Sequence, residues 1–480
     1  MIRNLLKRLI HEYGFITGIG VFVGKYSDAL VLKVRDSGVN WINFQFTDLL
    51  GYLRQVTVSL EKFLNGIVVK LDGSSVKGFT GVEESDLVLK PVIESFVKIP
   101  WLNGVGRFLC TVYSGSERFS RDPRYVAEKL DDLLHNNGLK PLVSAEIEYF
   151  IFDRIRVYLD VWKQVLEIAS SEAYWSLNAP FNKLKDGYYT PHPRDRFEDF
   201  KLEVAETLEK SFNIVIESYH HEVACSSQHE IVFQGGSATY VADTIQTIKY
   251  VIKTLAYKKG FVASFLPKPV YGDNGSGMHI HISLWSGENN VFYDPSDKYY
   301  LSREARYFIG GLLMHARALA AFTNPTTNSY KRLVPGYEAP VYLVWGRGNR
   351  SAAIRIPGYA TTSKTLRIEY RPPDPSANPY LAIPAVILAG LDGVKKKIDP
   401  GDPVEGNVYR MSRSKRLEYG IRELPRSLDE ALDELENDND WLKPVFTKDL
   451  LEKYIELKRE ESRKISSYPN PSEIYHYIDV

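Results

Sequence analysis

The sequence predicts an α+β protein with a small, strand-rich first domain and a larger second domain. A chain of 480 residues exceeds the size at which a single hydrophobic core stops growing, so two domains are expected. Up to about residue 122, short alternating segments are separated by turn residues. Beyond that point, long segments with helical spacing are mixed with well-separated strands.

The elements of the first domain follow in order from its start. Ser27–Ser37 has helical spacing, offers Ser27 as an N-cap and is followed by a glycine. Trp41–Phe46 and Leu53–Ser59 alternate apolar and polar residues, as half-buried strands do. A further strand, Gly66–Leu71, runs into a strong turn signal, Asp72-Gly-Ser-Ser75. These segments predict a small sheet.

The second domain opens with a helix. Asp122 followed by proline favours a helix start, and the pattern continues through Pro123–Asn136. Strands and long helices then alternate. The tail from Ser427 is highly charged and ends in a predicted helix, Lys448–Ile465. No internal repeat and no low-complexity tract interrupts this order.

The segment Met1–Gly24 starts basic and ends apolar, which superficially resembles a secretion signal. His11 and Glu12 interrupt it, and no small-residue cleavage site follows. Apolar residues instead recur at helical spacing: Ile2, Leu5, Leu6, Leu9 and Ile10. We expect a short amphipathic helix here.

Composition is that of an ordinary globular protein, with 44% hydrophobic residues, 25% charged residues and a formal net charge of +0. This balance argues against nucleic-acid binding, which normally requires a basic surplus. The two cysteines, Cys110 and Cys225, form no CxxC pair, so neither a disulfide framework nor a thiolate zinc site is expected. No segment is apolar enough to span a bilayer. A reducing, cytoplasmic compartment and no membrane partner are expected.

Two glutamates, Glu146 and Glu148, lie one residue apart within an apolar segment that reads as a strand. Side chains alternate along a strand, so the two carboxylates point to the same face. Two like charges on a buried strand cost roughly several kcal/mol unless a positive group lies between them. A divalent cation with oxygen ligands is one solution. Salt bridges, or an exposed strand end, are the alternative.

Three further strands also direct polar groups to one side. His220 and Glu222 share a face, and Glu230 opens the next apolar segment. A glycine-rich turn leads into a strand that presents His279, His281 and Ser283 together, and Arg367, Glu369 and Arg371 repeat the pattern. An isolated histidine or ion pair in a strand is usually structural. Four such strands favour a shared site.

The ligand types indicate which metal this site suits. Five carboxylates (Glu146, Glu148, Glu222, Glu230 and Glu369) and one or two imidazoles favour Mg²⁺ or Mn²⁺ over zinc or an iron–sulfur cluster. Their charge balances two to three divalent ions, an arrangement that can clamp a transferring phosphoryl group.

Arginines gather in two other segments. Tyr330–Pro340 has the Pro and Gly punctuation of an ordered loop, and Gly348–Pro357 carries Arg350 and Arg355. Guanidinium groups suit carboxylate and phosphate oxygens. A site in which metal ions face arginines is suited to bind a polyanion such as ATP. The chain has neither a GxxxxGK[ST] segment nor a GxGxxG after a strand, so its phosphate site belongs to neither of those folds.

Together these motifs resemble the glutamine synthetase family, from about Asp28 to the C-terminus. The segments that carry the resemblance are Lys70–Ser75, Ser144–Glu148, Gly187-Tyr188, His220–Glu222, Asn274–His279, Asn324–Pro340, Arg367–Glu369 and Phe446–Glu461. The last of these is similar to the prokaryotic long form, type I.

The resemblance implies a β-grasp domain at 25–122, a catalytic domain at 123–480 with a curved antiparallel sheet and helices, and an extension at 1–24. The extension is either a packing helix or the product of an early start codon. The resemblance also implies a homo-oligomer, a dodecamer of two stacked hexameric rings with active sites shared between subunits.

The resemblance further implies two metal sites and a nucleotide site. One metal would be held by Glu148, Glu222 and Glu230, and the other by Glu146, His279 and Glu369. His281 and Ser283 would bind the nucleotide, with Arg355 and Lys364 on its phosphates. Arg332 and Arg371 would bind the glutamate carboxylates, with the Gly275 backbone near the amino group, and Arg350 would stabilise the phosphoryl group.

The implied reaction is the ATP-dependent ligation of ammonia to the γ-carboxylate of L-glutamate, through a γ-glutamyl phosphate, giving L-glutamine, ADP and phosphate. Asp72, Ser75, Tyr188, Glu222 and Glu338 would surround ammonium, with Asp72 reaching in from a neighbouring subunit to accept its proton. Glu338 would lie on a loop that closes over the intermediate.

Two alternatives and two departures accompany the resemblance. A γ-glutamyl-amine ligase would alter the ammonium pocket, and a non-catalytic nitrogen-sensing relative would lack metal ligands; neither change is present. The sequence after Tyr409 is Arg-Met-Ser, whereas members regulated by adenylylation carry acidic, Leu and Pro residues there. We therefore expect no adenylylation of Tyr409. Residues 154–186 carry little family signature, and nothing is inferred from them.

Overall fold

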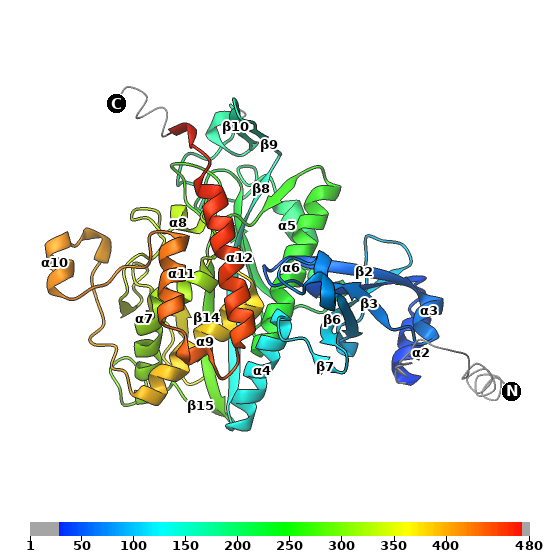
Figure 1. Cartoon of the computed structure of the whole chain (residues 1–480). Helices are drawn as coiled ribbons and strands as arrows, with labels where there is room; N and C mark the ends of the chain where they lie inside the picture. The colour runs from blue at the N-terminus through cyan, green and yellow to red at the C-terminus, as the bar shows by residue number, and fades with distance from the viewer. Residues whose placement is uncertain (1–27, 178, 473–480) are drawn as a thin grey trace.

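The computed structural model describes residues 28–177 and 179–472, and Figure 1 shows its arrangement. A small N-terminal unit lies beside a larger body, and the last long helix runs across that body. The predicted N-terminal helix around residues 2–10 falls outside the described residues. No helix in the described ranges has the length and apolar character needed to cross a membrane.

The N-terminal unit is built on a sheet in which strands follow the order β2-β1-β6-β4-β3, with β5 and β7 paired to β6. Only β1 and β6 run parallel. Its core contains Phe44, Phe63 and Phe108. The elements are α2 Asp28–Asp36, β1 Trp41–Thr47, β2 Leu53–Ser59, α3 Leu60–Leu64, β3 Val69–Asp72, η1 Gly73–Ser75, η2 Val82–Glu84, β4 Asp86–Pro91, η3 Ile93–Ser95, β5 Val97–Lys98, β6 Val105–Ser114 and β7 Glu117–Arg118.

The turn after β3 has a local physical cause. Asp72 caps η1, and its carboxylate accepts hydrogen bonds from Ser74 N at 2.9 Å and from Ser75 Oγ at 2.8 Å. A side chain at Gly73 would place its Cβ 2.5 Å from Thr80 Oγ1 and 2.8 Å from Leu87 Cδ1, so these side chains would have to shift. This turn presents Asp72 on the surface of the N-terminal unit.

The larger body contains a second sheet in the order β11-β12-β8-β14-β18-β17-β16, with β13 on β8 and β15 on β14. All its pairs are antiparallel except β16 with β17. Its strands are β8 Lys140–Phe152, β11 Ile216–His221, β12 Gln228–Phe233, β13 Val262–Ser264, β14 Met278–Ser286, β15 Asn289–Asn290, β16 Trp345–Arg347, β17 Ile354–Ile356 and β18 Ile368–Tyr370.

Helices and a separate hairpin complete the body. Strands β9 Arg154–Leu159 and β10 Gln164–Ala169 pair only with each other, and they lie in the segment 154–186, for which no structure is predicted. The helices are α4 Pro123–Asn136, η4 Tyr174–Ser176, α5 Glu198–Phe212, α6 Ala238–Lys258, α7 Arg303–Thr323, α8 Ser329–Arg332, α9 Pro379–Lys396, η5 Val408–Arg410, α10 Arg413–Glu418, α11 Leu428–Asn437, η6 Asp440–Leu442 and α12 Lys448–Ser466.

Strand β8 separates an apolar face from a polar one. Ala145, Ile147 and Tyr149 are buried in one large hydrophobic cluster together with residues of α4 and α6, such as Leu130 and Ile245. Glu146 and Glu148 alternate with them and therefore face the other side. The strand expected from the sequence is confirmed, and it carries the two carboxylates away from the helices.

The predicted elements occur, and some of their boundaries shift. The helix Pro123–Asn136 and the strand Leu53–Ser59 occur as predicted, and the last helix extends one residue further, to Ser466. The strand expected from Gly66 starts only at Val69, because Gly66 has a φ of 74° and closes the turn after α3. The first described helix begins at Asp28, and its predicted cap, Ser27, lies outside the described residues.

Candidate active site

A polar cavity of about 290 Å³ opens on the face of β8 that carries Glu146 and Glu148. Its wall combines carboxylates, guanidinium groups, imidazoles and aromatic rings. The lining residues are Glu146, Glu148, Tyr188, Tyr189, His220, Glu222, Gln228, Glu230, Asn274, Gly275, His279, Arg332, Tyr337, Glu338, Ala339, Arg350, Arg355, Tyr359, Glu369 and Arg371.

Cross-strand pairing brings the polar residues of separate segments together. Glu148 lies opposite Glu230 on β12, whereas Glu146 lies opposite His279 on β14. Further across the sheet, Glu369 of β18 faces both His281 of β14 and Arg355 of β17. Register partners project to the same side of a sheet. One row of paired side chains therefore crosses the floor of the cavity.

The first acidic cluster lies on the β11–β12 side. Ligand atoms of His220, Glu222 and Glu230 lie within 4.8 Å of one another. His220 Nε2 is 3.0 Å from Glu230 Oε1. Glu148 borders this group, and its Oε2 accepts hydrogen bonds from Gly277 N at 2.8 Å and Gln228 Nε2 at 3.0 Å. The sequence had grouped Glu148, not His220, with the other two.

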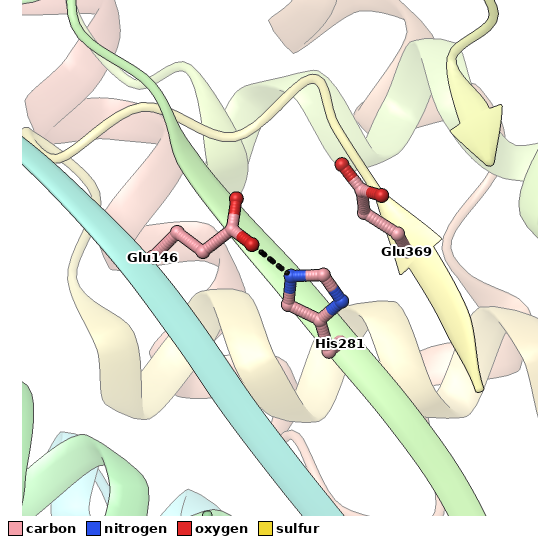
Figure 2. Close-up of side chains that lie close together, drawn as sticks. All are labelled: Glu146, His281 and Glu369. Carbon is pink, nitrogen blue, oxygen red and sulfur yellow. Dashed lines mark hydrogen bonds and ion pairs between the residues drawn. The ribbon is translucent and has the colours of Figure 1, made fainter. Parts of the chain in front are cut away.

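The second cluster lies on the β14–β18 side. Figure 2 shows Glu146, His281 and Glu369, from three neighbouring strands, directed toward one another, and their ligand atoms lie within 4.8 Å. His281 Nε2 is 3.0 Å from one oxygen of Glu146, and His279 Nδ1 is 3.0 Å from the other. The sequence had placed His279 here as ligand and His281 at the nucleotide; both imidazoles contact Glu146.

The two clusters differ in their electrostatics. Burial raises the pKa of Glu148 to about 7, and burial with repulsion from Glu148 and Glu230 raises that of Glu222 well above its ordinary range. Burial also disfavours the charged form of Glu146, but hydrogen bonds with His279 and His281 outweigh it and lower its pKa. In the first cluster, burial and mutual repulsion therefore disfavour the charged carboxylates, which a bound cation would stabilise.

Carboxylate-rich clusters with one imidazole each fit hard divalent cations such as Mg²⁺ and Mn²⁺. Buried polar atoms without hydrogen-bond partners among the described residues include Asn274 Oδ1 and Arg355 Nε, and both residues line the cavity. These two atoms can therefore form hydrogen bonds with a polar ligand in the cavity.

Four arginines line the cavity, and two of them, Arg355 and Arg371, contact the second cluster. Arg355 Nη1 donates to Glu369 Oε2 at 2.5 Å, and Arg371 Nε donates to Glu369 Oε1 at 3.1 Å. Arg332 is buried and donates to the Pro372 carbonyl at 2.7 Å. Arg350 hydrogen-bonds the Tyr188 hydroxyl. The cavity thus juxtaposes anionic clusters, suited to metals, with guanidinium groups, suited to anions.

Glycines allow this close packing at the start of β14. A side chain at Gly275 would place its Cβ 2.2 Å from the Pro267 carbonyl oxygen. A Cβ at Gly277 would lie 2.7 Å from Arg332 Nη2 and 2.9 Å from His279 Nε2. The backbone therefore approaches the cavity directly at Gly275, as the glycine-rich turn predicted.

Several predicted site residues lie outside this cavity. Asp72 and Ser75 are on the N-terminal unit and do not line it. Ser283 is buried and accepts a hydrogen bond from Trp285 Nε1 at 3.0 Å, while Lys364 is exposed. The described chain by itself does not bring the proposed ammonium-binding residues together.

Sequence reasoning missed several lining residues. Gln228 occupies the same strand face as Glu230, two positions earlier, so alternation along β12 could have found it. Tyr189, Tyr337 and Tyr359 reach the cavity from irregular segments, where no periodic pattern points to a face. His220 was expected on one of the four strands of the site but was given no role as a metal ligand.

Two acidic clusters that suit divalent cations and face several arginines define a site of the class found in metal-dependent enzymes that transfer phosphoryl groups. Two family models match this chain: the glutamine synthetase catalytic domain over residues 120–477 and the glutamine synthetase β-grasp domain over residues 38–115. The chain belongs to the glutamine synthetase family, which confirms the resemblance and the β-grasp fold expected from it.

Individual relatives agree with this assignment. Glutamine synthetase of Sulfolobus acidocaldarius is 49% identical, and the alignment covers 93% of this chain and 97% of that protein. The Thermotoga maritima enzyme is 43% identical over 93% of this chain and 98% of that protein. The structure of Plasmodium falciparum glutamine synthetase superposes with a TM-score of 0.85 at 29% identity, covering 96% of this chain and 100% of that chain.

Proposed function

We propose that this chain is a glutamine synthetase that ligates ammonia to the γ-carboxylate of L-glutamate at the expense of ATP. The observation that carries the proposal is the cavity in which two carboxylate–imidazole clusters face Arg332, Arg350, Arg355 and Arg371. Identity of 38–49% to several curated glutamine synthetases over 93% of the chain supports it.

We assign Mg²⁺ or Mn²⁺, two to three ions per site, to the carboxylate clusters. Glu148, Glu222 and Glu230, with His220 beside them, would hold one ion, and Glu146, Glu369 and an imidazole of β14 would hold another. Bound ions supply positive charge that neutralises phosphate oxygens of ATP.

The substrates are assigned to the remaining residues. Arg332 and Arg371 would bind the carboxylates of glutamate, with its amino group near the Gly275 backbone. His281 and Ser283 would contact the nucleotide, and Arg355 and Lys364 its phosphates. The unpartnered Nε of Arg355 supports its part in this assignment.

In the first step, an oxygen of the γ-carboxylate attacks the terminal phosphorus of ATP. The bond from that phosphorus to the β–γ bridging oxygen breaks, and ADP leaves. This converts a poor electrophile into an acyl phosphate. Arg350, whose guanidinium lies at the cavity wall beside Tyr188, would stabilise the charge of the transferring group.

In the second step, ammonium would bind among Tyr188, Glu222 and Glu338 of one subunit and Asp72 and Ser75 of another. The Asp72 carboxylate would accept one proton from ammonium, and the resulting ammonia would attack the acyl carbon. The bond from that carbon to the phosphate oxygen would break, and the leaving phosphate would take the second proton from the nitrogen. Hydrogen bonds from Ser74 and Ser75 lower the pKa of Asp72, which keeps this carboxylate charged and able to attract ammonium. The loop that carries Glu338 would exclude water during this step.

We further propose that the chain assembles into a homo-oligomer, a dodecamer of two hexameric rings. Asp72 is exposed and does not line the cavity of its own chain, which supports a site shared between subunits. The β9–β10 hairpin presents apolar side chains to solvent, including Val161 at 101% and Trp162 at 81% exposure, which supports burial of this surface against another copy. We also retain the predicted domain limits of 25–122 and 123–480.

The proposal is tested by incubating the purified chain with ATP, Mg²⁺, L-glutamate and either ammonium or a panel of amines. Phosphate release and product mass are then measured. We expect release with ammonium and a product with the mass of glutamine. Release only with amines would identify an amine ligase, and no release under any condition would contradict catalysis altogether.

A further inference from the structure

A hydrogen bond joins the loop that carries Glu338 to a segment far along the chain. The Tyr409 hydroxyl donates to the Ala339 carbonyl at 2.6 Å, across 70 residues of sequence. Tyr409 lies in η5, and Ala339 directly follows Glu338 at the wall of the cavity. The hydroxyl therefore contacts the backbone of the loop beside its functional carboxylate.

The segment around Tyr409 is anchored to a second wall of the same cavity. Val408 N donates to Ser351 Oγ at 3.1 Å, and Asn349 Nδ2 donates to the Val404 carbonyl at 2.8 Å. The rings of Tyr409 and Tyr342 lie 5.9 Å apart in a small hydrophobic cluster. Because residues 349 and 351 flank Arg350, Tyr409 is held against the loop that presents this arginine.

The Glu338 loop needs such external contacts. Glu338 has a φ of 60°, a left-handed conformation that is strained for a residue with a side chain. Its Oε2 accepts a hydrogen bond from Asn274 Nδ2 at 3.3 Å, and Lys185 Nζ donates to the Gly336 carbonyl at 2.9 Å. Tyr409 supplies the contact on the C-terminal side of the loop.

We propose that Tyr409 is a positioning residue whose hydroxyl latches the Glu338 loop against the cavity and couples it to the Arg350 loop. This inference rests on the proposed function for its catalytic consequence but not for the contact itself. Burial raises the pKa of Tyr409 to about 12, so the phenol keeps its proton and remains a donor at neutral pH.

The latch has a chemical consequence. A γ-glutamyl phosphate reacts with water as well as with ammonia, and water attack releases phosphate and regenerates glutamate without forming glutamine. A loop that opens more often admits more water. Loss of the hydroxyl should therefore raise the ratio of phosphate released to glutamine formed, rather than weaken ATP binding.

The variant Tyr409→Phe removes only the hydroxyl, and Tyr342→Phe is the matched control. Tyr342 packs on Tyr409 in the same cluster, and among the described residues its hydroxyl has no hydrogen bond. Loop opening is measured without any reaction, from the rate at which a glutamyl endoprotease cuts the Glu338–Ala339 bond of the intact protein. The phosphate-to-glutamine ratio is measured in parallel.

We expect Tyr409→Phe to speed cleavage at Glu338 about fivefold, the equivalent of one neutral hydrogen bond of about 1 kcal/mol, and to raise the phosphate-to-glutamine ratio. Tyr342→Phe should change neither. Unchanged cleavage in Tyr409→Phe, or an equal rise in both variants, overturns the latch. Faster cleavage only in Tyr409→Phe, in a chain that forms no glutamine at all, supports the latch and contradicts the proposed function.

Discussion

Glu146 and His279 are register partners on the antiparallel strands β8 and β14, and His279 Nδ1 lies 3.0 Å from Glu146 Oε2. Two residues along β8, Glu148 has its partner, Glu230, on the opposite neighbour, β12. One strand thus supplies adjacent carboxylates to two clusters that lie on either side of it. His279 and His281 compensate the charge of Glu146, whereas Glu148 lies beside Glu230 and burial raises its pKa to about 7.

Replacing Arg350 by alanine should lower kcat by about a hundredfold or more while changing the KM for ATP little. The reason is that this guanidinium would act on charge that develops during phosphoryl transfer rather than on the bound nucleotide. Steady-state kinetics with varied ATP measure the effect. Arg347→Ala, on the neighbouring strand β16, is the control. An increase in KM with unchanged kcat would assign Arg350 to nucleotide binding instead.

The proposed sharing of active sites between subunits predicts complementation between inactive chains. Asp72→Asn and Arg350→Ala should each abolish most activity, because they alter different halves of a composite site. Co-expressed together, the two chains should form mixed oligomers in which some sites combine an intact Asp72 with an intact Arg350. Recovery of a substantial fraction of wild-type activity is the expected result. No recovery in mixed oligomers of verified composition would place Asp72 at the cavity of its own chain.

Tyr409 should carry no nucleotidyl group in the protein isolated from its native host. The residues after it lack the acidic, Leu and Pro pattern, and its hydroxyl already donates to the Ala339 carbonyl at 2.6 Å. Peptide mass spectrometry of nitrogen-replete and nitrogen-starved cells tests this expectation. A nucleotidyl mass increment on the peptide that contains Tyr409 would overturn it.

Lys249 should make the free energy of unfolding depend on pH in the neutral to alkaline range. Burial lowers its pKa from 10.5 to about 7, so between these values the unfolded chain binds more protons than the folded one. Stability should therefore rise with pH across this interval and fall as pH drops toward 7. Between pH 7 and pH 9, deprotonation of Lys249 should raise the free energy of unfolding by about 2 kcal/mol.

Melting temperatures at pH 7 and pH 9 measure this contribution. Lys249→Met should remove much of the rise and stabilise the chain near pH 7. Lys258→Met, in the last turn of the same helix α6, provides an exposed control. The same pH dependence in the wild type and in Lys249→Met would show that this amine does not titrate between these limits.

The polar row on the sheet could be predicted in part, because alternation alone places Glu146 with Glu148 and His279 with His281. The assignment of partners could not, since it depends on long-range strand register. His281 thus proves to contact Glu146, and His220 to contact Glu230. Glu222 was expected within a strand, but β11 ends at His221 and Glu222 follows it.

Residues outside regular strands were harder to place. Tyr337 and Tyr359 reach the cavity from loops whose paths depend on tertiary contacts, such as the Lys268 ammonium 3.6 Å from the Tyr337 ring centroid. The turn at Asp72 was predicted correctly, whereas the proposed place of Asp72 at the cavity of a second copy stays a prediction.

The central structural claim is that Glu146 and Glu148 serve different metal ions. Mn²⁺ binding to the wild type, Glu146→Gln and Glu148→Gln, measured with and without a non-hydrolysable ATP analogue, tests it most directly. Glu217→Gln, an exposed position on β11, is the control. Glu146→Gln should lose the ion whose affinity increases with nucleotide, because its cluster adjoins Arg355. Glu148→Gln should lose the other ion and keep the nucleotide-dependent one. The same loss in both variants would contradict the claim.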